Sequence, residues 1–528
     1  MRVSKQLVGL CLALVPLTVS SAAAAAPDER LIEAAAAQQT ALVRDLLKQG
    51  VDVNASRADG TTALLWAAHW DDLVSVDLLL QAGAKVNTAD DHGVTPLARA
   101  CVNASEATVA RLLTAGADPN VAQTNGLTPL MIAARTGNVA VVNALLTRGA
   151  KVDATTATTY ETALMWAIAE RHFEVVLTLI DKGANVHPTP RQAFSPLMRA
   201  VKNGDIETTK ALIAAGARVN DGGADGTNPL VYAIVSGQAA AAHLLLELGA
   251  DPNGSIDGIS ALHAAAGSVD TWLRAWTRRH GGGGPYYLER PRLKLTERLP
   301  LVKELLSRGA NPNARISASE MMGGFLRNGA FDTFTTGTGN VAGATPLWVA
   351  AYSMNGGGGF GGTRPANVVT STGEILRALL AAGADPQIRT EDGTTALMGA
   401  AGCGWSTYTP GKKRADRRPT AEEAVKILVE EGRAEVNTAN EGAFTPLHCA
   451  AFSGLNEVVQ YLADHGAELD ARDWRGRTPY RLAEGAKQSF QFQDWPETAA
   501  LLRSLGADTG LGIPGTVHER LRVELAQQ

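Results

Sequence analysis

Aromatic residues and cysteine are scarce in this chain of 528 residues. Phe, Trp and Tyr together make up 5% of it, and only four Cys are present. Cys11 lies in an apolar amino-terminal stretch, which leaves Cys101, Cys403 and Cys449 as an odd number spread widely along the chain. Such spacing is not typical of a disulfide scaffold. We therefore expect a fold that is stabilised by packing, without a disulfide framework.

Long apolar runs and a strong charge of one sign are also missing. After residue 26, no apolar run reaches the roughly 20 residues that a membrane-spanning helix needs. The formal net charge is −5, which is modest for this length but acidic. This acidity, together with the export signal described below, disfavours nucleic acid as a partner.

Catalytic and metal-binding motifs are absent as well. A Gly-rich run covers Gly356 to Gly359, but no Gly-Lys-Ser/Thr follows it, so it is not a phosphate loop. Neither Gly-x-Ser-x-Gly nor His-Glu-x-x-His occurs. Four Cys and His residues in the last third fit no zinc-binding spacing: Cys403, His448, Cys449 and His465. We expect no cofactor, no metal and no catalytic residue.

The first 26 residues have the order of segments found in a secretory signal peptide. Arg2 and Lys5 precede an apolar core from Leu7 to Val19, and small residues follow up to Ala26. The apolar core is too short for a membrane anchor, which needs about 20 residues. We expect this leader to be removed and the mature protein to reside in the periplasm or outside the cell.

What the chain does contain is an internal repeat. Gly residues followed by a phrase similar to Gly-Ala-Asp-Pro-Asn recur along it: Gly50, Gly83, Gly116, Gly149, Gly183, Gly216, Gly249, Gly309, Gly383, Gly432, Gly466 and Gly506. The first six intervals are 33, 33, 33, 34, 33 and 33 residues. A fixed period of this kind indicates stacked units that cannot bury their apolar faces alone. The positions predict about twelve units.

A second phrase recurs in phase with the first, for example TALLWAA from Thr62, TPLMIAA from Thr128 and TPLHCAA from Thr445. Its Thr can cap a helix, its Pro suits the first helical turn, and the Gly after the second helix supplies a left-handed stop. From about residue 28 to 508 the chain resembles the ankyrin repeat family, in a secreted, bacterial-type form. The resemblance implies an all-α ankyrin-repeat solenoid of about twelve helix–turn–helix–hairpin units.

The repeat also predicts a domain organisation. Residues 27–54 lack the second phrase and begin with charged residues, as expected for a terminal repeat with one face in water. The predicted parts are a signal peptide (1–26), an amino-terminal capping repeat (27–54), regular repeats (55–253), repeats with inserted loops (254–508) and a tail (509–528). Within the tail, residues 517–526 are expected to form one short helix.

The inserted loops are concentrated in the carboxy-terminal third. They expand the loop between the two helices at residues 269–299, 353–373, 402–420 and 485–496, and a hairpin at 314–343. Two of the loops are basic, with seven Lys/Arg against three acids in 269–299 and five against one in 402–420. Insertions on one edge of a solenoid often bind partners, but long insertions are also tolerated at little cost, and both interpretations stay open. The candidate loop residues are Trp272, Tyr286, Tyr287, Trp405, Lys412, Lys413, Arg414, Arg417 and Arg418.

The resemblance further implies that partners contact the hairpin tips and the residues after the Ala pair of the first helix, on the concave face. Carried over by position, these are His69, Trp70, Asp91, His92, Arg135, Thr136, Arg191, Lys202, Asn203, Tyr352, Phe452, Trp474, Arg475 and Arg477. Phe194 and Phe444 occupy hairpin positions as well, where contact with a partner and internal packing are equally plausible. His263 and His448 occupy the His of the phrase, whose usual role is hydrogen bonding within the repeat.

These observations favour an exported, monomeric, non-catalytic scaffold that binds another protein. The alternative is an enzyme or ligand-binding protein whose site is built from the inserted loops of repeats eight to ten, with Trp272, Tyr286, Tyr287, Trp405 and Cys403 as its wall. A third interpretation is a structural scaffold of the cell envelope, which predicts weak and non-selective binding.

Overall fold

In every repeat after the first, the first helix begins where a side chain caps its amino terminus, as the sequence predicts; α1 (Arg30–Ala36) has no such cap. In the second repeat, Thr62 Oγ1 accepts a hydrogen bond of 3.3 Å from the backbone N–H of Leu65. Thr95 Oγ1 accepts one of 3.2 Å from Ala98 in the third repeat. Such caps satisfy backbone donors that the first helical turn leaves without a partner.

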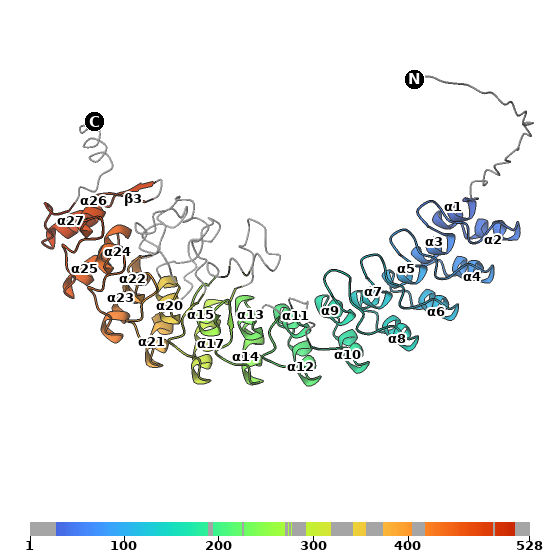
Figure 1. The fold of residues 1–528 in the computed structure, drawn as a ribbon, viewed down its shortest axis with the longest axis horizontal. Helices are drawn as coiled ribbons and strands as arrows, with labels where there is room; N and C mark the ends of the chain where they lie inside the picture. Colours follow the sequence, from blue (N-terminus) through green and yellow to red (C-terminus); the bar gives the residue numbers. More distant parts are fainter. Residues whose placement is uncertain are drawn as a thin grey trace, which may run out of the picture. The chain divides into compact units, whose positions relative to one another are not determined.

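The computed structural model describes residues 28–187, 194–223, 226–269, 273, 276, 292–317, 342–354, 373–403, 418–488 and 491–512 (Figure 1). The first helices, called inner helices below, are α1 (Arg30–Ala36), α3 (Ala63–His69), α5 (Pro96–Val102), α7 (Pro129–Thr136), α9 (Ala163–Ala169), α11 (Pro196–Asn203), α13 (Pro229–Val235), α15 (Ala261–Ala266), α20 (Pro346–Met354), α22 (Ala396–Ala400), α24 (Pro446–Ser453) and α26 (Pro479–Glu484).

The second, or outer, helices are α2 (Thr40–Lys48), α4 (Leu73–Gln81), α6 (Glu106–Thr114), α8 (Val139–Thr147), α10 (Phe173–Asp181), α12 (Ile206–Ala214), α14 (Ala239–Glu247), α17 (Leu295–Ser307), α21 (Gly373–Ala381), α23 (Arg418–Lys426), α25 (Asn456–Asp464) and α27 (Pro496–Ser504). A π-helix, η3 (Ile427–Glu431), continues α23. The chain is thus an all-α ankyrin-repeat solenoid of about twelve units, with inserted residues in the carboxy-terminal half of the sequence.

The helices are distributed over two compact units. Unit 1 consists of residues 1–124 and 147–150, and unit 2 of residues 125–146 and 151–528. Within unit 1, α3 packs against α1 and α5, and α4 packs against α2 and α6, so that inner and outer helices form two rows (Figure 1). Unit 2 has the same two rows, with for example α9 against α11 and α10 against α12. Leu64 and Leu79 in unit 1 and Leu197 and Leu212 in unit 2 are buried between the rows.

The hairpins that connect the repeats are linked by backbone hydrogen bonds. Asp91 N donates to Asp59 O at 2.9 Å in unit 1, and Trp474 N donates to Gly442 O at 3.1 Å in unit 2. The Asn that ends the Gly-Ala-Asp-Pro-Asn phrase adds a second link, since Asn87 Nδ2 donates to Gly116 O at 3.2 Å. This Asn recurs in phase with the repeat, which is the sequence signal for its structural role.

The only strands within the described ranges are two short antiparallel pairs. β1 (Ser255–Ile256) pairs with β2 (Ile259–Ser260), with Ser255 opposite Ser260. β3 (Ala486–Gln488) pairs with β4 (Gln491–Gln493), with Lys487 opposite Phe492. The second pair lies inside the predicted insertion 485–496, between α26 and α27.

The insertion predicted at 269–299 is shorter than the sequence indicated. Helix α17 already begins at Leu295 and is 13 residues long, with Pro300 inside it. Its buried Arg298 donates from Nη1 to the carbonyl oxygens of Ala264 (3.1 Å) and Ala265 (2.9 Å) near the end of α15. The extra helical turn thus supplies a cap for the preceding helix, which corrects its description as a loop.

The left-handed stop of the tenth repeat is displaced by one residue. Gly432 has φ −83°, and the following Arg433 has φ +57°. The cause is η3, because a π-helix turn accommodates one more residue than an α-helical turn. The prediction that Gly432 provides the stop is therefore wrong, and the interval from Arg433 to Gly466 returns to the 33-residue period.

Replacing Arg433 with Gly is expected to stabilise this repeat by about 1 kcal/mol, because an L-residue in the left-handed region is strained by roughly that amount. Amide hydrogen exchange in η3 and α25 measures the effect. Gly466→Ala serves as the reciprocal control: Gly466 has φ +83° and open space around its missing Cβ, so this change should destabilise by a similar amount. Faster exchange in Arg433→Gly would contradict the assignment.

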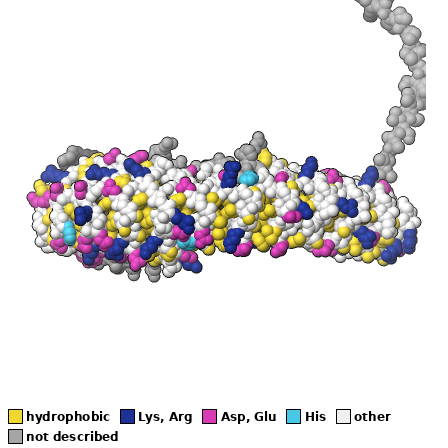
Figure 2. Space-filling view, turned by 90° about the horizontal axis from the view of Figure 1, so that it is seen from below, with side chains coloured by type: hydrophobic (Ala, Val, Ile, Leu, Met, Phe, Trp, Pro, Cys, Tyr) yellow, Lys and Arg dark blue, Asp and Glu magenta, His cyan; other side chains and the backbone are white. Residues whose placement is uncertain are grey.

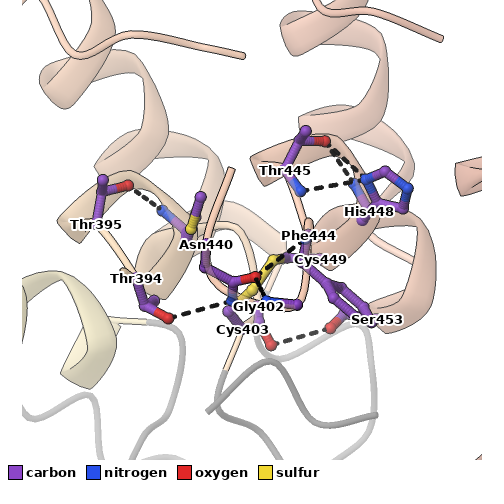
Figure 3. Close-up of a disulfide and its surroundings, with 12 residues drawn as sticks. Thr394, Thr395, Gly402, Cys403, Asn440, Phe444, Thr445, His448, Cys449 and Ser453 are labelled. Carbon is purple, nitrogen blue, oxygen red and sulfur yellow. Dashed lines mark hydrogen bonds between the residues drawn. A yellow bond between two sulfur atoms is a disulfide. The ribbon is translucent and has the colours of Figure 1, made fainter. Parts of the chain in front are cut away.

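Cys403 and Cys449 form a disulfide that the sequence analysis did not expect (Figure 3). Cys403 follows α22, and Cys449 lies in α24 of the next repeat, so the bond crosses between neighbouring inner helices. Ser453 Oγ donates to Gly402 O at 3.3 Å beside it. This disulfide corrects the expectation that packing alone stabilises the fold. Cys101 is a buried free thiol, and burial raises its pKa to about 12.

The predicted signal peptide and the helix expected at 517–526 lie outside the described residues, and the predicted domain boundaries stay predictions. Across the described ranges, every helix is too short or too polar to cross a lipid bilayer.

Candidate partner-binding surface

The predicted contact residues of α3 form an aromatic cluster with a residue that the sequence analysis missed. Trp66, His69 and Trp70 make up this α3 cluster, with Trp66 and Trp70 stacked at 6.4 Å between ring centroids and His69 edge-on to Trp70 at 4.7 Å. Trp70 is 43% exposed. Its Nε1 donates to Ala36 O at 3.0 Å, which holds the indole against the end of α1.

A cation adjoins the α3 cluster from the next inner helix. Burial, and secondly the nearby Arg99 guanidinium, lower the pKa of His69, so this imidazole is neutral at pH 7. Arg99 itself lies 3.7 Å from the Asp90 carboxylate. The surface therefore combines exposed aromatic area with a positive charge, which are the residue types that most often dominate protein interfaces.

The hairpin residues Asp91 and His92 are both exposed, as expected for a tip. Their backbone groups join the ladder between hairpins, since Thr124 N donates to His92 O at 3.0 Å. Their side chains extend the inner surface of unit 1. By inner surface we mean the exposed side chains of the inner helices and of the hairpins before them.

In unit 2, Arg135 and Trp166 form a similar combination. The Arg135 guanidinium lies over the Trp166 ring at 5.7 Å from its centroid, a distance at which a cation is attracted to the ring face. Arg135 is exposed, and its carbonyl oxygen is hydrogen-bonded to His172 Nε2 at 3.0 Å. The neighbouring Thr136 is partly exposed and donates to Ala133 O at 3.0 Å, within its own helix.

Lys202 and Asn203 lie one repeat after α9 and have different roles: one is exposed to solvent and the other makes a structural hydrogen bond. Lys202 is exposed at the end of α11. Asn203 Nδ2 donates to Ile168 O at 3.0 Å and caps the end of α9. In the same helix, Arg199 forms an ion pair of 2.5 Å with Glu161. Arg199 was not among the predicted residues, although it occupies the same phrase position as Arg99.

Three predicted contact residues are buried, which corrects their expected exposure. Tyr352 is 7% exposed and stacks on Trp348 at 5.0 Å. Phe452 is 5% exposed, and its carbonyl oxygen accepts a hydrogen bond of 2.7 Å from Trp495 Nε1. Arg477 is buried against Asp473, as described in the Discussion. These side chains pack between repeats, so their placement does not favour a direct contact with a partner.

At the last hairpin, Trp474 is 49% exposed and carries the Arg475 guanidinium 4.6 Å from its ring centroid. This pair keeps the character that the sequence predicts for a contact surface. Arg191, the remaining predicted position, lies outside the described residues.

Phe194 and Phe444 both pack inside the protein. The sequence had left open whether these side chains contact a partner or pack internally. Phe194 stacks on Tyr232 at 5.1 Å and meets Trp276 edge-on at 6.4 Å. Phe444 is buried and lies 5.6 Å from the His448 ring. Trp276 belongs to the insertion 269–299, is buried, and donates from Nε1 to Thr227 Oγ1 at 2.7 Å. At least this part of the insertion packs against inner helices.

Most of the predicted loop residues lie outside the described ranges: Trp272, Tyr286, Tyr287, Trp405, Lys412, Lys413, Arg414 and Arg417. Arg418 begins α23, and its side chain also lies outside them. Cys403, the remaining member of the alternative site, is buried and joined to Cys449, so it offers no free thiol. Among the described residues, His, Cys, Asp and Glu form no group of three that would hold a metal ion.

The outer helices present a different surface. Figure 2 shows acidic and basic side chains interspersed over this side, without one large patch of a single sign. A hollow of about 530 Å³ lies here in unit 2, lined among others by Glu422, Lys426, Tyr461 and Asp464. Lys426 pairs with Glu422 at 2.7 Å, and Tyr461 Oη donates to Glu430 at 3.0 Å. These groups satisfy one another. The exposed aromatic side chains of the described ranges, Trp70 and Trp474, belong to the inner surface instead.

Short segments of this chain are similar to parts of known proteins. Alpha-latrocrustotoxin-Lt1a of Latrodectus tredecimguttatus is 42% identical over 82 residues, which are 16% of this chain and 5% of the toxin. Human protein phosphatase 1 regulatory subunit 27 is 37% identical over 62 residues, 12% of this chain and 40% of that protein. The chain thus spans less than half the length of each of these relatives.

Among solved structures, the human ASB11 ankyrin repeat domain matches with 28% identity and a TM-score of 0.37, over 41% of this chain and 96% of that domain. The family described as ankyrin repeats (3 copies) matches residues 31–123, 103–190, 191–256 and 366–473, which together exceed half of the sequence. The chain belongs to the ankyrin repeat family.

Proposed function

We propose that this protein is a non-catalytic scaffold that binds another protein through its inner surface. The observation that carries the proposal is the α3 cluster, where Trp70 remains 43% exposed beside Trp66, His69 and the Arg99 charge. Buried aromatic and Arg anchors supply most of the energy of typical interfaces. Membership of a family that generally lacks catalysis supports the non-catalytic part of the proposal.

The protein acts outside the cytoplasm, in the periplasm or as a secreted protein, and as a monomer that does not bind nucleic acid. The order of segments in residues 1–26 supports export. The Cys403–Cys449 disulfide supports the same compartment, because disulfides persist in oxidising environments and are rare in the cytosol. Amino-terminal sequencing of the protein from fractionated cells tests export, and intact Met1 in the cytosol would overturn it.

Replacing Trp70 with Ala should weaken capture of the partner from a periplasmic extract by at least tenfold, the effect typical of an aromatic anchor. The immobilised full chain and the variant are compared by quantifying each retained protein. Because Trp70→Ala also removes the bond to Ala36 O, Trp70→Phe is measured in parallel, and it should retain most of the binding if ring area is what matters.

The matched control is Val74→Ala on the outer helix α4, where the exposed side chain is 52% accessible. It should leave capture unchanged. If Val74→Ala weakens capture as strongly as Trp70→Ala, or if Trp70→Ala has no effect, the inner surface of unit 1 does not bind the partner.

A further inference from the structure

One pair of residue types occurs twice at the same positions of consecutive inner helices. In unit 1, Trp66 of α3 is followed one repeat later by Arg99 of α5. In unit 2, Trp166 of α9 is followed by Arg199 of α11, and both members are displaced by 100 residues, which is three repeats. All four side chains are partly exposed. Each pair lies within a single unit, so each is a separate candidate site.

The two pairs also share the same unsatisfied donors. The indole Nε1 of Trp66 and the guanidinium Nε of Arg99 are covered, yet neither donates a hydrogen bond within the described part of the chain. The same holds for Trp166 Nε1 and Arg199 Nε. A covered donor without an acceptor costs about 1–3 kcal/mol, so four such atoms at equivalent positions call for an acceptor. Trp70, by contrast, donates to Ala36 O.

The charge around each pair favours an anionic acceptor. Within the described ranges, Arg99 has one ion pair, with the Asp90 carboxylate at 3.7 Å, and the neighbouring His69 is neutral. In unit 2, Arg199 is paired with Glu161, but the exposed Arg135 lies over the Trp166 ring and adds a second cation. Because the side chains are only partly buried, a small rotation would bring their N–H groups to an acceptor that approaches over the inner surface.

We propose that the Trp66–Arg99 and Trp166–Arg199 pairs each bind a carboxylate side chain, so that the partner presents an acidic polypeptide segment to the inner surface. The carboxylate accepts hydrogen bonds from the indole N–H and from the Arg guanidinium, and charge-assisted bonds of this kind are stronger than neutral ones. The inference rests on the proposed function, whose partner it specifies chemically. Neither aromatic packing alone nor the family's usual contact positions account for the four unsatisfied donors.

The experiment titrates the full-length chain with acetylated tetraglutamate and, as the uncharged control, tetraglutamine. The indole N–H signals of Trp66 and Trp166 are followed by nitrogen–proton correlation spectroscopy and assigned with Trp66→Phe and Trp166→Phe. Both signals should shift with tetraglutamate and not with tetraglutamine, whereas the Trp70 signal, already hydrogen-bonded, should shift less. Equal shifts with both peptides, or none, would overturn the proposal.

Arg99→Gln should weaken the response at Trp66 about tenfold and leave Trp166 unchanged, while Arg199→Gln should do the converse. Arg44→Gln, the same change of charge at an exposed position of the outer helix α2, is the control. If Arg44→Gln weakens both responses as much, only net charge is being measured and the proposal fails.

The outcome is separable from that of the proposed function. If a captured partner depends on Trp70 but binds an Arg99→Gln, Arg199→Gln double variant as tightly as wild type, the scaffold function stands and the acidic segment does not. If the peptide responses occur as described and no inner-surface partner exists, the carboxylate sites stand and the scaffold proposal fails.

Discussion

Replacing Asp473 with Asn is expected to destabilise the carboxy-terminal repeats by about 3–5 kcal/mol, since it leaves a buried Arg charge without its counter-ion. Asp473 Oδ2 accepts a hydrogen bond of 2.7 Å from Nε of Arg477 and lies 2.7 Å from its Nη2 in an ion pair, and the two side chains are 0% and 3% exposed. Asp473 Oδ1 also accepts from the backbone N–H of Arg477 at 2.8 Å. Amide hydrogen exchange in α24 to α26 measures the loss locally, which suits a long repeat array that need not unfold in one step.

The double variant Asp473→Asn, Arg477→Met is the control for this ion pair. It removes both charges, so it should be less destabilising than Asp473→Asn alone. A double variant that is as unstable as the sum of the two single changes would show that the ion pair does not act as a unit.

Lowering the pH from about 6.5 to 4 should reduce stability by about 3 kcal/mol for each of His263 and His448, because burial lowers the pKa of each to about 4. Each ring accepts a hydrogen bond at Nδ1 from the backbone N–H of its capping residue, Ser260 or Thr445. A group with a lowered pKa in the folded state binds its proton first in the unfolded chain. The contribution is therefore complete above pH 6.5 and is lost as the pH falls toward 4.

The variant His448→Gln isolates this effect from that of the carboxylates. Urea unfolding monitored by tryptophan fluorescence, in wild type and variant, should show a stability difference that is largest at pH 7 and narrows toward pH 4. A difference that stays constant over this range would contradict the buried neutral state of His448.

The sequence predicts the inner helices well because their determinants are local. Thr62 and Thr95 cap their helices through hydrogen bonds that span three residues, and the apolar spacing repeats in every unit. A recurring local signal can be read without tertiary information. The all-α repeat architecture and the exposure of Trp70 and Trp474 follow from it.

The predictions that the structure corrects share a different physical cause, because they concern residues whose positions depend on contacts between repeats. The Cys403–Cys449 bond joins residues 46 positions apart, across an insertion of unpredictable path. By its position in the repeat, Arg477 is predicted to be an exposed hairpin residue, whereas the structure buries it beside Asp473. The sequence signal for this ion pair is the spacing of four residues between the two opposite charges. The π-helix that displaces the stop to Arg433 is marked in the sequence only by the 34-residue interval from Gly432 to Gly466. Gly149 to Gly183 has the same 34-residue interval without a displaced stop, so the interval alone does not identify the π-helix.

Only part of the candidate site could be predicted from the sequence, because the rest depends on contacts between repeats. Positions after the Ala pair, such as His69 and Trp70, carry over from the family resemblance. Trp66 and Arg99 lie earlier in their helices, and their importance emerges only when their donors are seen to lack acceptors. Asn203 is the opposite case: the sequence predicts that it contacts a partner, but its side chain donates a hydrogen bond to Ile168 O within the repeat array.

The central claim is that the inner surface binds a protein partner, and amide hydrogen exchange of the captured complex tests it most directly. The account predicts slower exchange on binding in inner elements, particularly residues 62–70, 91–103 and 162–171, with the outer helices α4 and α10 unchanged. Protection confined to α4, α10 and the other outer helices would contradict it.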